Sequence, residues 1–170
     1  AHGNARGKKF LLQAALGVTA VLEGMVYILF FAWIAALAAG ALAVAVTGIC
    51  LITRLNIAGL IPAMPYFGAL VAGVCFLAFA VLLAAAAYYC LAYARQIIRA
   101  SARWHKNMLG GSALPPLPWN PQFSPKTGRT LRRIVLLSLT VFGASLVLGF
   151  LVLAIQAGAV EFWHALDWFV

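Results

Sequence analysis

Hydrophobic residues gather along this chain in four long stretches, at residues 10–33, 34–53, 66–93 and 131–156. Each stretch is near or above the roughly 20 residues that an α-helix needs to cross a hydrocarbon core about 30 Å thick. The pattern predicts an all-α fold: a polytopic transmembrane helical bundle of about four hydrophobic helices, in a single membrane domain that covers residues 1–170.

The first two stretches form one continuous apolar block. As a single helix, this block would measure about 66 Å at 1.5 Å per residue, roughly twice the hydrocarbon thickness. We therefore expect the chain to reverse in the small-residue run 35–40, which gives helices at residues 10–33 and 34–53. The alternative is three crossings, with residues 10–22 on the membrane surface and a bend at Glu23-Gly24.

Prolines and glycines predict the bounds of the third helix. Pro62 and Pro65 precede it, and proline removes a backbone donor and disfavours helix in the residue before it. Gly110 and Gly111 follow, and glycine is typical of a helix end. We therefore expect this helix at residues 66–108.

Four prolines mark residues 109–124 as an extended connector. Ser124 followed by Pro125 is typical of a helix start, so we expect the last helix at residues 125–157. The aromatic segment 159–170 is too short to cross the bilayer. It is expected to form a C-terminal interfacial segment.

Small residues recur four positions apart in three of these segments, as Ala20 and Gly24, Ala69 and Gly73, and Ser145 and Gly149. Such spacing lets helices approach each other closely in lipid. It supports a compact bundle rather than a specific dimer.

Composition agrees with lipid as the solvent. Hydrophobic residues make up 65% of the chain and charged residues only 9%, whereas a soluble domain carries about a quarter charged residues. The net charge is +9, and eight of the twelve Lys and Arg lie between Arg95 and Arg133. Because Lys and Arg flank membrane spans on the cytoplasmic side, this bias indicates membrane topology and not a nucleic-acid partner.

We therefore expect a multi-pass protein of the cell inner membrane, with the loop 94–130 in the cytoplasm. If three crossings precede this loop, the N-terminus falls outside, together with Arg6, Lys8 and Lys9. An N-terminus inside the cell requires one crossing fewer, as in the alternative with a surface segment.

The loop begins with a regular set of cations. Arg95, Arg99, Arg103 and Lys106 are spaced 4, 4 and 3 residues apart, which places them on one face of a cytoplasmic, basic extension of the third helix. In the simplest interpretation, these cations only set the orientation of the helix in the membrane. It is also suited to anionic lipid headgroups, at about 1 kcal/mol for each Lys or Arg, or to an acidic protein partner.

Glu23 is the candidate intramembrane polar site. It lies in the middle of the first apolar stretch, where an ionised carboxylate costs about 2.5–3.5 kcal/mol on insertion scales. It is a candidate proton or cation site, or a partner for a basic residue. The structural alternative is a protonated or interfacial Glu23 that is hydrogen-bonded to Thr19, one turn earlier.

The sequence shows no pattern of an enzyme. It has no paired carboxylates, phosphate loop or metal-binding cluster. Ser101 and His105 are one helical turn apart, but the sequence places no carboxylate near them. Cys50, Cys75 and Cys90 lie in apolar segments, which favours packing over metal binding. We expect neither catalysis nor a cofactor or metal.

The second half of the chain carries a family resemblance. The segments Arg95-Gln96-Ile97-Ile98-Arg99 and Trp104-His105-Lys106-Asn107 form a basic amphipathic stretch, and the chain closes on Trp168-Phe169. In this layout, residues 66–170 resemble bacterial membrane proteins whose soluble part is called the HAAS signalling domain. The resemblance implies a regulatory role. The acidic helical domain that precedes the spans in those proteins is not part of this sequence.

Together these features predict a non-enzymatic integral membrane protein with a regulatory or scaffold role. Its expected partners are membrane lipids, chiefly anionic ones, and proteins in the membrane or the cytoplasm. Two alternatives stay open: an accessory subunit of a membrane transporter or other membrane complex, and a small transporter or channel that uses Glu23.

Overall fold

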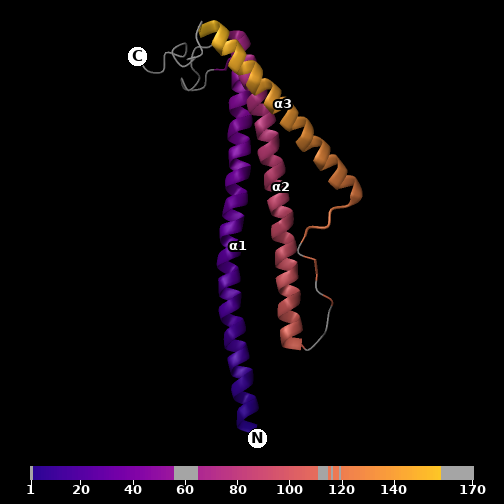
Figure 1. Ribbon diagram of the computed structural model, residues 1–170. Helices are drawn as coiled ribbons and strands as arrows, with labels where there is room; N and C mark the ends of the chain where they lie inside the picture. Colours follow the sequence, from indigo (N-terminus) through magenta and orange to yellow (C-terminus); the bar gives the residue numbers. More distant parts are fainter. Residues whose placement is uncertain (1, 56–64, 111–114, 116, 119, 158–170) are drawn as a thin grey trace, which may run out of the picture. The chain divides into compact units, whose positions relative to one another are not determined.

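The computed structural model describes residues 2–55, 65–110, 115, 117–118 and 120–157. In these residues it consists of three α-helices and no strands (Figure 1). They are α1 (His2–Thr53), α2 (Tyr66–Gly110) and α3 (Pro125–Ala157). The all-α prediction is confirmed. Each helix is long and apolar enough to cross a membrane, as expected of a multi-pass membrane protein.

The prediction of two separate helices at residues 10–33 and 34–53 is wrong. α1 is a single helix of 52 residues, and it continues without interruption through the run 35–40 and through Glu23-Gly24. The physical reason is the composition of the run. Alanine and leucine are among the strongest helix formers, and the single Gly40 costs only about 1 kcal/mol.

The later helices begin where the sequence predicts. α2 begins at Tyr66, after the prolines, and ends at Gly110. α3 begins at Pro125, and the backbone N–H of Thr127 donates to Ser124 Oγ at 3.3 Å, which is the geometry of an N-cap. The interfacial segment predicted at residues 159–170 lies outside the described residues.

The chain divides into two compact units. Unit 1 comprises Ala1–Ala36 and Tyr88–Gln122, and unit 2 comprises Leu37–Ala87 and Phe123–Val170. Each unit therefore contains part of α1 and part of α2. The connector belongs to unit 1 as far as Gln122, and α3 belongs to unit 2.

In unit 2, α1 and α2 approach each other at two glycines. A Cβ added to Gly73 would lie 2.6 Å from Ile52 Cγ1 and 2.8 Å from the carbonyl oxygen of Gly48. A Cβ on Gly48 would lie 3.0 Å from the carbonyl oxygen of Gly73. The two backbones are thus nearly in contact, as small residues allow in membrane helices.

α3 packs on α2 in the same unit. The rings of Phe79 and Phe142 stack with their centroids 5.5 Å apart. Gly149 faces Val71, whose Cγ1 would lie 3.6 Å from an added Cβ. Ser145, one turn earlier than Gly149, is also buried.

Two of the three small-residue pairs are therefore used in packing. Ala69 and Gly73 are buried, and Gly73 faces α1; Ser145 is buried, and Gly149 faces Val71 of α2. The pair Ala20 and Gly24 is different, because nothing lies within 4 Å of a Cβ added to Gly24. Spacing alone does not distinguish a packed pair from an exposed one.

We predict that Gly73→Ala destabilises the protein, because the new methyl group meets the backbone of α1. Overpacking of this kind costs about 1–3 kcal/mol. The matched control is Gly143→Ala in α3, where an added Cβ meets nothing within 4 Å. That change should be neutral or stabilising by up to about 1 kcal/mol through helix propensity. Thermal unfolding in detergent, followed by circular dichroism, measures both. Equal midpoints would show that the glycine contact is not a packing constraint.

Candidate functional site

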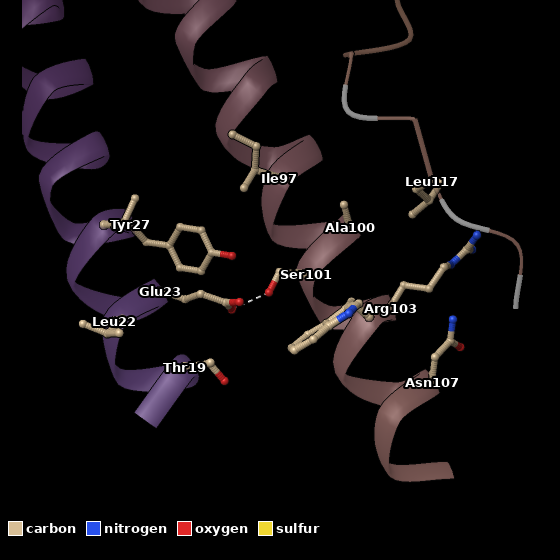
Figure 2. Close-up of a pocket in the computed structure, with 12 residues that line it drawn as sticks. Thr19, Leu22, Glu23, Tyr27, Ile97, Ala100, Ser101, Arg103, Asn107 and Leu117 are labelled. Carbon is tan, nitrogen blue, oxygen red and sulfur yellow. Dashed lines mark hydrogen bonds between the residues drawn. The ribbon is translucent and has the colours of Figure 1, made fainter. Parts of the chain in front are cut away.

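Unit 1 contains a pocket of about 540 Å³ (Figure 2). This volume lies within the range of about 300–1,000 Å³ that is typical of small-molecule sites. Its lining comes from α1, from α2 and from the connector: Thr19, Leu22, Glu23, Val26 and Tyr27; Ile97, Ala100, Ser101, Arg103, Trp104 and Asn107; and Leu117.

Helical periodicity explains why these residues share one pocket. On α1 the lining positions recur every three or four residues, from Thr19 to Tyr27. On α2 they recur in the same way from Ile97 to Asn107. Residues at this spacing lie on one face of a helix. The pocket therefore forms where two such faces of unit 1 meet, and Leu117 adds a wall from the connector.

A polar cluster lies inside this mainly apolar lining. The hydroxyl of Ser101 donates a hydrogen bond to Glu23 Oε2 (Figure 2). Nδ1 of His105 lies 3.9 Å from the same oxygen and 3.1 Å from the carbonyl oxygen of Ser101. The side chains of His105 and Glu23 are 22% and 34% exposed. The cluster is thus half-buried, and it joins α1 to α2 within unit 1.

Two sequence-based expectations about this cluster are wrong. Ser101 and His105 do have a neighbouring carboxylate, because Glu23 reaches them from a position 78 residues earlier. Glu23 is not hydrogen-bonded to Thr19, whose hydroxyl donates instead to the carbonyl oxygen of Leu16 at 2.9 Å. The contact between Glu23 and Ser101 was not predicted, because a reversal of the chain was expected at residues 35–40. With α1 continuous, Glu23 and Ser101 lie at similar distances along their helices from the segment that joins α1 to α2.

The geometry of the cluster is not that of an activated nucleophile. In a catalytic triad the imidazole accepts the proton of the serine hydroxyl, and the carboxylate orients the imidazole. Here the Ser101 hydroxyl donates directly to the carboxylate. Nε2 of His105 is buried, and it has no hydrogen-bond partner in the part of the chain that the structure describes. The hydrogen bond fixes Glu23 in the pocket and does not activate Ser101.

The predicted basic face divides into two parts. Arg95, Arg99 and Lys106 are exposed. Arg103 is half-buried, lines the pocket, and donates through Nη1 to the carbonyl oxygen of Pro115 at 3.2 Å. Three of the four cations are therefore available at the surface, and the fourth belongs to the pocket.

Gln96 was not among the candidate site residues predicted from the sequence. It is buried, and its Nε2 donates to the carbonyl oxygen of Pro118 at 2.6 Å. Together with the contact between Arg103 and Pro115, this bond holds the connector on α2. A polar residue between two arginines gave no signal in the sequence, because any exposed helix face contains such residues.

We predict that Glu23 and Ser101 are energetically coupled. In a double-mutant cycle of Glu23→Ala and Ser101→Ala, the coupling free energy should be about 0.5–1.5 kcal/mol, as expected for one half-buried hydrogen bond. The matched control pairs Thr19→Ala with Ser101→Ala, because the Thr19 hydroxyl bonds only within α1. That cycle should be additive. Thermal unfolding in detergent measures both, and additivity in the first cycle would contradict the contact.

Comparisons of the chain with protein-family models, curated proteins and solved structures found no match. The resemblance to HAAS-type membrane proteins therefore stays a prediction. A functional assignment rests on the geometry of the helices and of unit 1.

Proposed function

We propose that this chain is a non-enzymatic membrane protein with a regulatory or scaffold role, and that it presents a basic surface to the anionic lipids of the cytoplasmic leaflet. The observation that carries the proposal is the exposed row of Arg95, Arg99 and Lys106 on α2. The accessory-subunit and transporter alternatives stay predictions.

The charge balance around this row supports an anionic partner. In the described residues Glu23 is the only carboxylate, and it is already engaged by Ser101. Within the described residues, the ion-pair contact of Glu23 is with His105 and not with an arginine or lysine. The positive charge of the row is thus not neutralised within the described chain, and it attracts negative headgroups at about 1 kcal/mol for each residue.

The length of α2 supports a position of the row at the membrane surface. α2 has 45 residues, and a single crossing needs roughly 20. Tyrosines favour the interface between lipid and water, and Tyr88, Tyr89 and Tyr93 precede the row. The part of α2 after them carries the cations, which are costly in hydrocarbon.

The same argument applies to Glu23. Its hydrogen bond to Ser101 places it level with the basic segment, because Ser101 lies between Arg99 and Arg103. We propose that Glu23 lies at the interface, where a half-exposed carboxylate costs much less than at the bilayer centre. The contacts of Glu23 with Ser101 and His105 do not require a position inside the hydrocarbon core.

Three crossings also give a consistent topology. If each helix crosses once, the N-terminus and the loop 94–130 lie on the same side of the membrane. All of the twelve Lys and Arg except Arg54 then lie on that side. The positive-inside rule assigns this side to the cytoplasm, which supports placement in the cell inner membrane. The four-crossing arrangement expected from the sequence would have put the basic N-terminus on the opposite side.

We predict that the N-terminus faces the cytoplasm. A cysteine introduced by Asn4→Cys, in a chain whose three native cysteines are replaced by serine, should stay unlabelled by a membrane-impermeant maleimide in intact spheroplasts. It should become labelled after the cells are opened. Leu55→Cys in the same background should be labelled from outside, because one crossing separates the two positions. Labelling of Asn4→Cys in intact spheroplasts would contradict a cytoplasmic N-terminus.

We predict that the basic row selects anionic lipid. In reconstituted vesicles, quenching of tryptophan fluorescence by brominated phosphatidylglycerol should exceed quenching by brominated phosphatidylcholine. The triple change Arg95→Gln, Arg99→Gln and Lys106→Gln should weaken the relative binding constant for phosphatidylglycerol by up to about 100-fold, since three contacts of about 1 kcal/mol are lost. Arg54→Gln, on the opposite side, is the control and should change little. An unchanged preference in the triple variant would overturn the proposed role of the row.

A further inference from the structure

The basic row does not account for the pocket of unit 1, because none of its three cations lines the pocket. The lining is mainly apolar, and its charged residues are Glu23 and Arg103. Figure 2 shows the guanidinium of Arg103 directed toward the connector, on the side of α2 away from Glu23. At the α1 wall of the pocket, a ligand therefore meets the negative charge of Glu23 alone.

His105 does not neutralise this charge. Its Nδ1 lies 3.1 Å from the carbonyl oxygen of Ser101, which can only accept, so Nδ1 is the donor of this contact. The distance from Nδ1 to Glu23 Oε2 is longer, at 3.9 Å. Nε2 is buried and has no hydrogen-bond partner in the residues that the structure describes. A second proton on the ring would thus be buried without an acceptor, which is costly.

One oxygen of Glu23 is available to a ligand. Ser101 donates to Oε2, and within the described residues no hydrogen bond reaches Oε1. An ionised carboxylate accepts hydrogen bonds on both oxygens. The side chain of Glu23 is 34% exposed and lines the pocket, so a ligand in the pocket can reach it. The group that complements Oε1 is a cation with an N–H to donate.

Aromatic and aliphatic side chains surround the carboxylate. Tyr27 lies one turn after Glu23 on α1, and its side chain extends toward α2 (Figure 2). Trp104 lies one turn after Ser101 on α2 and is 44% exposed. The aliphatic part of the lining on the two helices comprises Leu22, Val26, Ile97 and Ala100. Aromatic rings attract ammonium groups, and aliphatic side chains favour an apolar molecule.

Other classes of ligand fit this lining less well. A metal ion takes several oxygen, nitrogen or sulfur ligands, and no three His, Cys, Asp or Glu side chains of the described chain lie together. A hydrated inorganic cation would gain nothing from the apolar side chains. An anion would be repelled by Glu23, and a neutral apolar molecule would leave Oε1 without a donor.

We propose that this pocket binds a hydrophobic amine as its ammonium ion. The ammonium N–H donates to Glu23 Oε1, and the apolar part of the ligand lies on the aliphatic side chains and on Trp104. The hydrogen bond from Ser101 holds the carboxylate in position for this contact. The site would give a regulatory membrane protein a small-molecule ligand. It does not rest on the lipid contacts of the basic row, and the two proposals can fail separately.

The experiment uses the full chain in micelles of dodecyl maltoside, which carries no charge. Equilibrium dialysis measures binding of tritiated phenylbutylamine, and empty micelles in a parallel cell give the amount that partitions into detergent. Phenylbutanol has the same apolar part without the charge, and phenylbutyltrimethylammonium has the charge without an N–H. Each should compete at least about tenfold more weakly than the unlabelled amine.

The competitors also define the results that contradict the proposal. Binding no greater than in empty micelles overturns it. Equal competition by phenylbutanol overturns the assignment of an ammonium ligand. Equal competition by phenylbutyltrimethylammonium overturns the hydrogen bond to Glu23 Oε1.

Variants locate the binding site. Glu23→Gln keeps the shape of the side chain and removes its charge, so binding should weaken by about 10- to 100-fold, as expected for one charge-assisted hydrogen bond. Unchanged binding by this variant overturns the proposal. Ala100→Phe keeps the carboxylate but fills the pocket, and it should abolish binding. Its matched control is Ala102→Phe, at an exposed position outside the pocket, which should bind as the unchanged chain does. Equal binding by the two phenylalanine variants overturns the location.

Discussion

In lipid, a peptide group outside a helix has no water to replace the hydrogen bond that the helix provided. Each unsatisfied backbone group costs several kcal/mol. Residues 35–40 contain only Ala, Leu and Gly, so no side chain in this run replaces such bonds. The chain therefore remains helical from His2 to Thr53. The site depends on this continuity, because it carries Glu23 to the same level as Ser101.

Local signals in the sequence were sufficient to predict an all-α fold and most of the helix ends. Pro65 before Tyr66 and Ser124 before Pro125 act on their immediate neighbours, so their effect is independent of the remainder of the fold. The reversal at residues 35–40 was inferred from bilayer thickness, which limits the part of a helix inside the membrane but not the total length of the helix. Helix propensity, which favours continuation through alanine, was the stronger constraint.

The candidate site could be predicted only as separate residues. Glu23 stood out as a carboxylate inside an apolar stretch, and Arg103 stood out through its helical spacing from other cations, but the spatial neighbours of both could not be read from the sequence. Ser101 meets a carboxylate 78 residues away, and Gln96 and Arg103 meet proline carbonyls across the connector. Such contacts arise from the pairing of helices. A single sequence gives the faces of the helices, but not the register in which two faces meet.

The side chains of α2 donate both of the hydrogen bonds described above that hold the connector on this helix. Gln96 and Arg103 donate, and Pro118 and Pro115 accept through their carbonyl oxygens. Proline has no backbone N–H to offer in return, so at these positions the segment cannot complete the ladder of a β-sheet. A second polypeptide therefore cannot recognise these positions by strand addition, and the segment is protected against edge-to-edge aggregation. Any protein that engages it must do so through its side chains, as grooves that bind extended proline-rich peptides do.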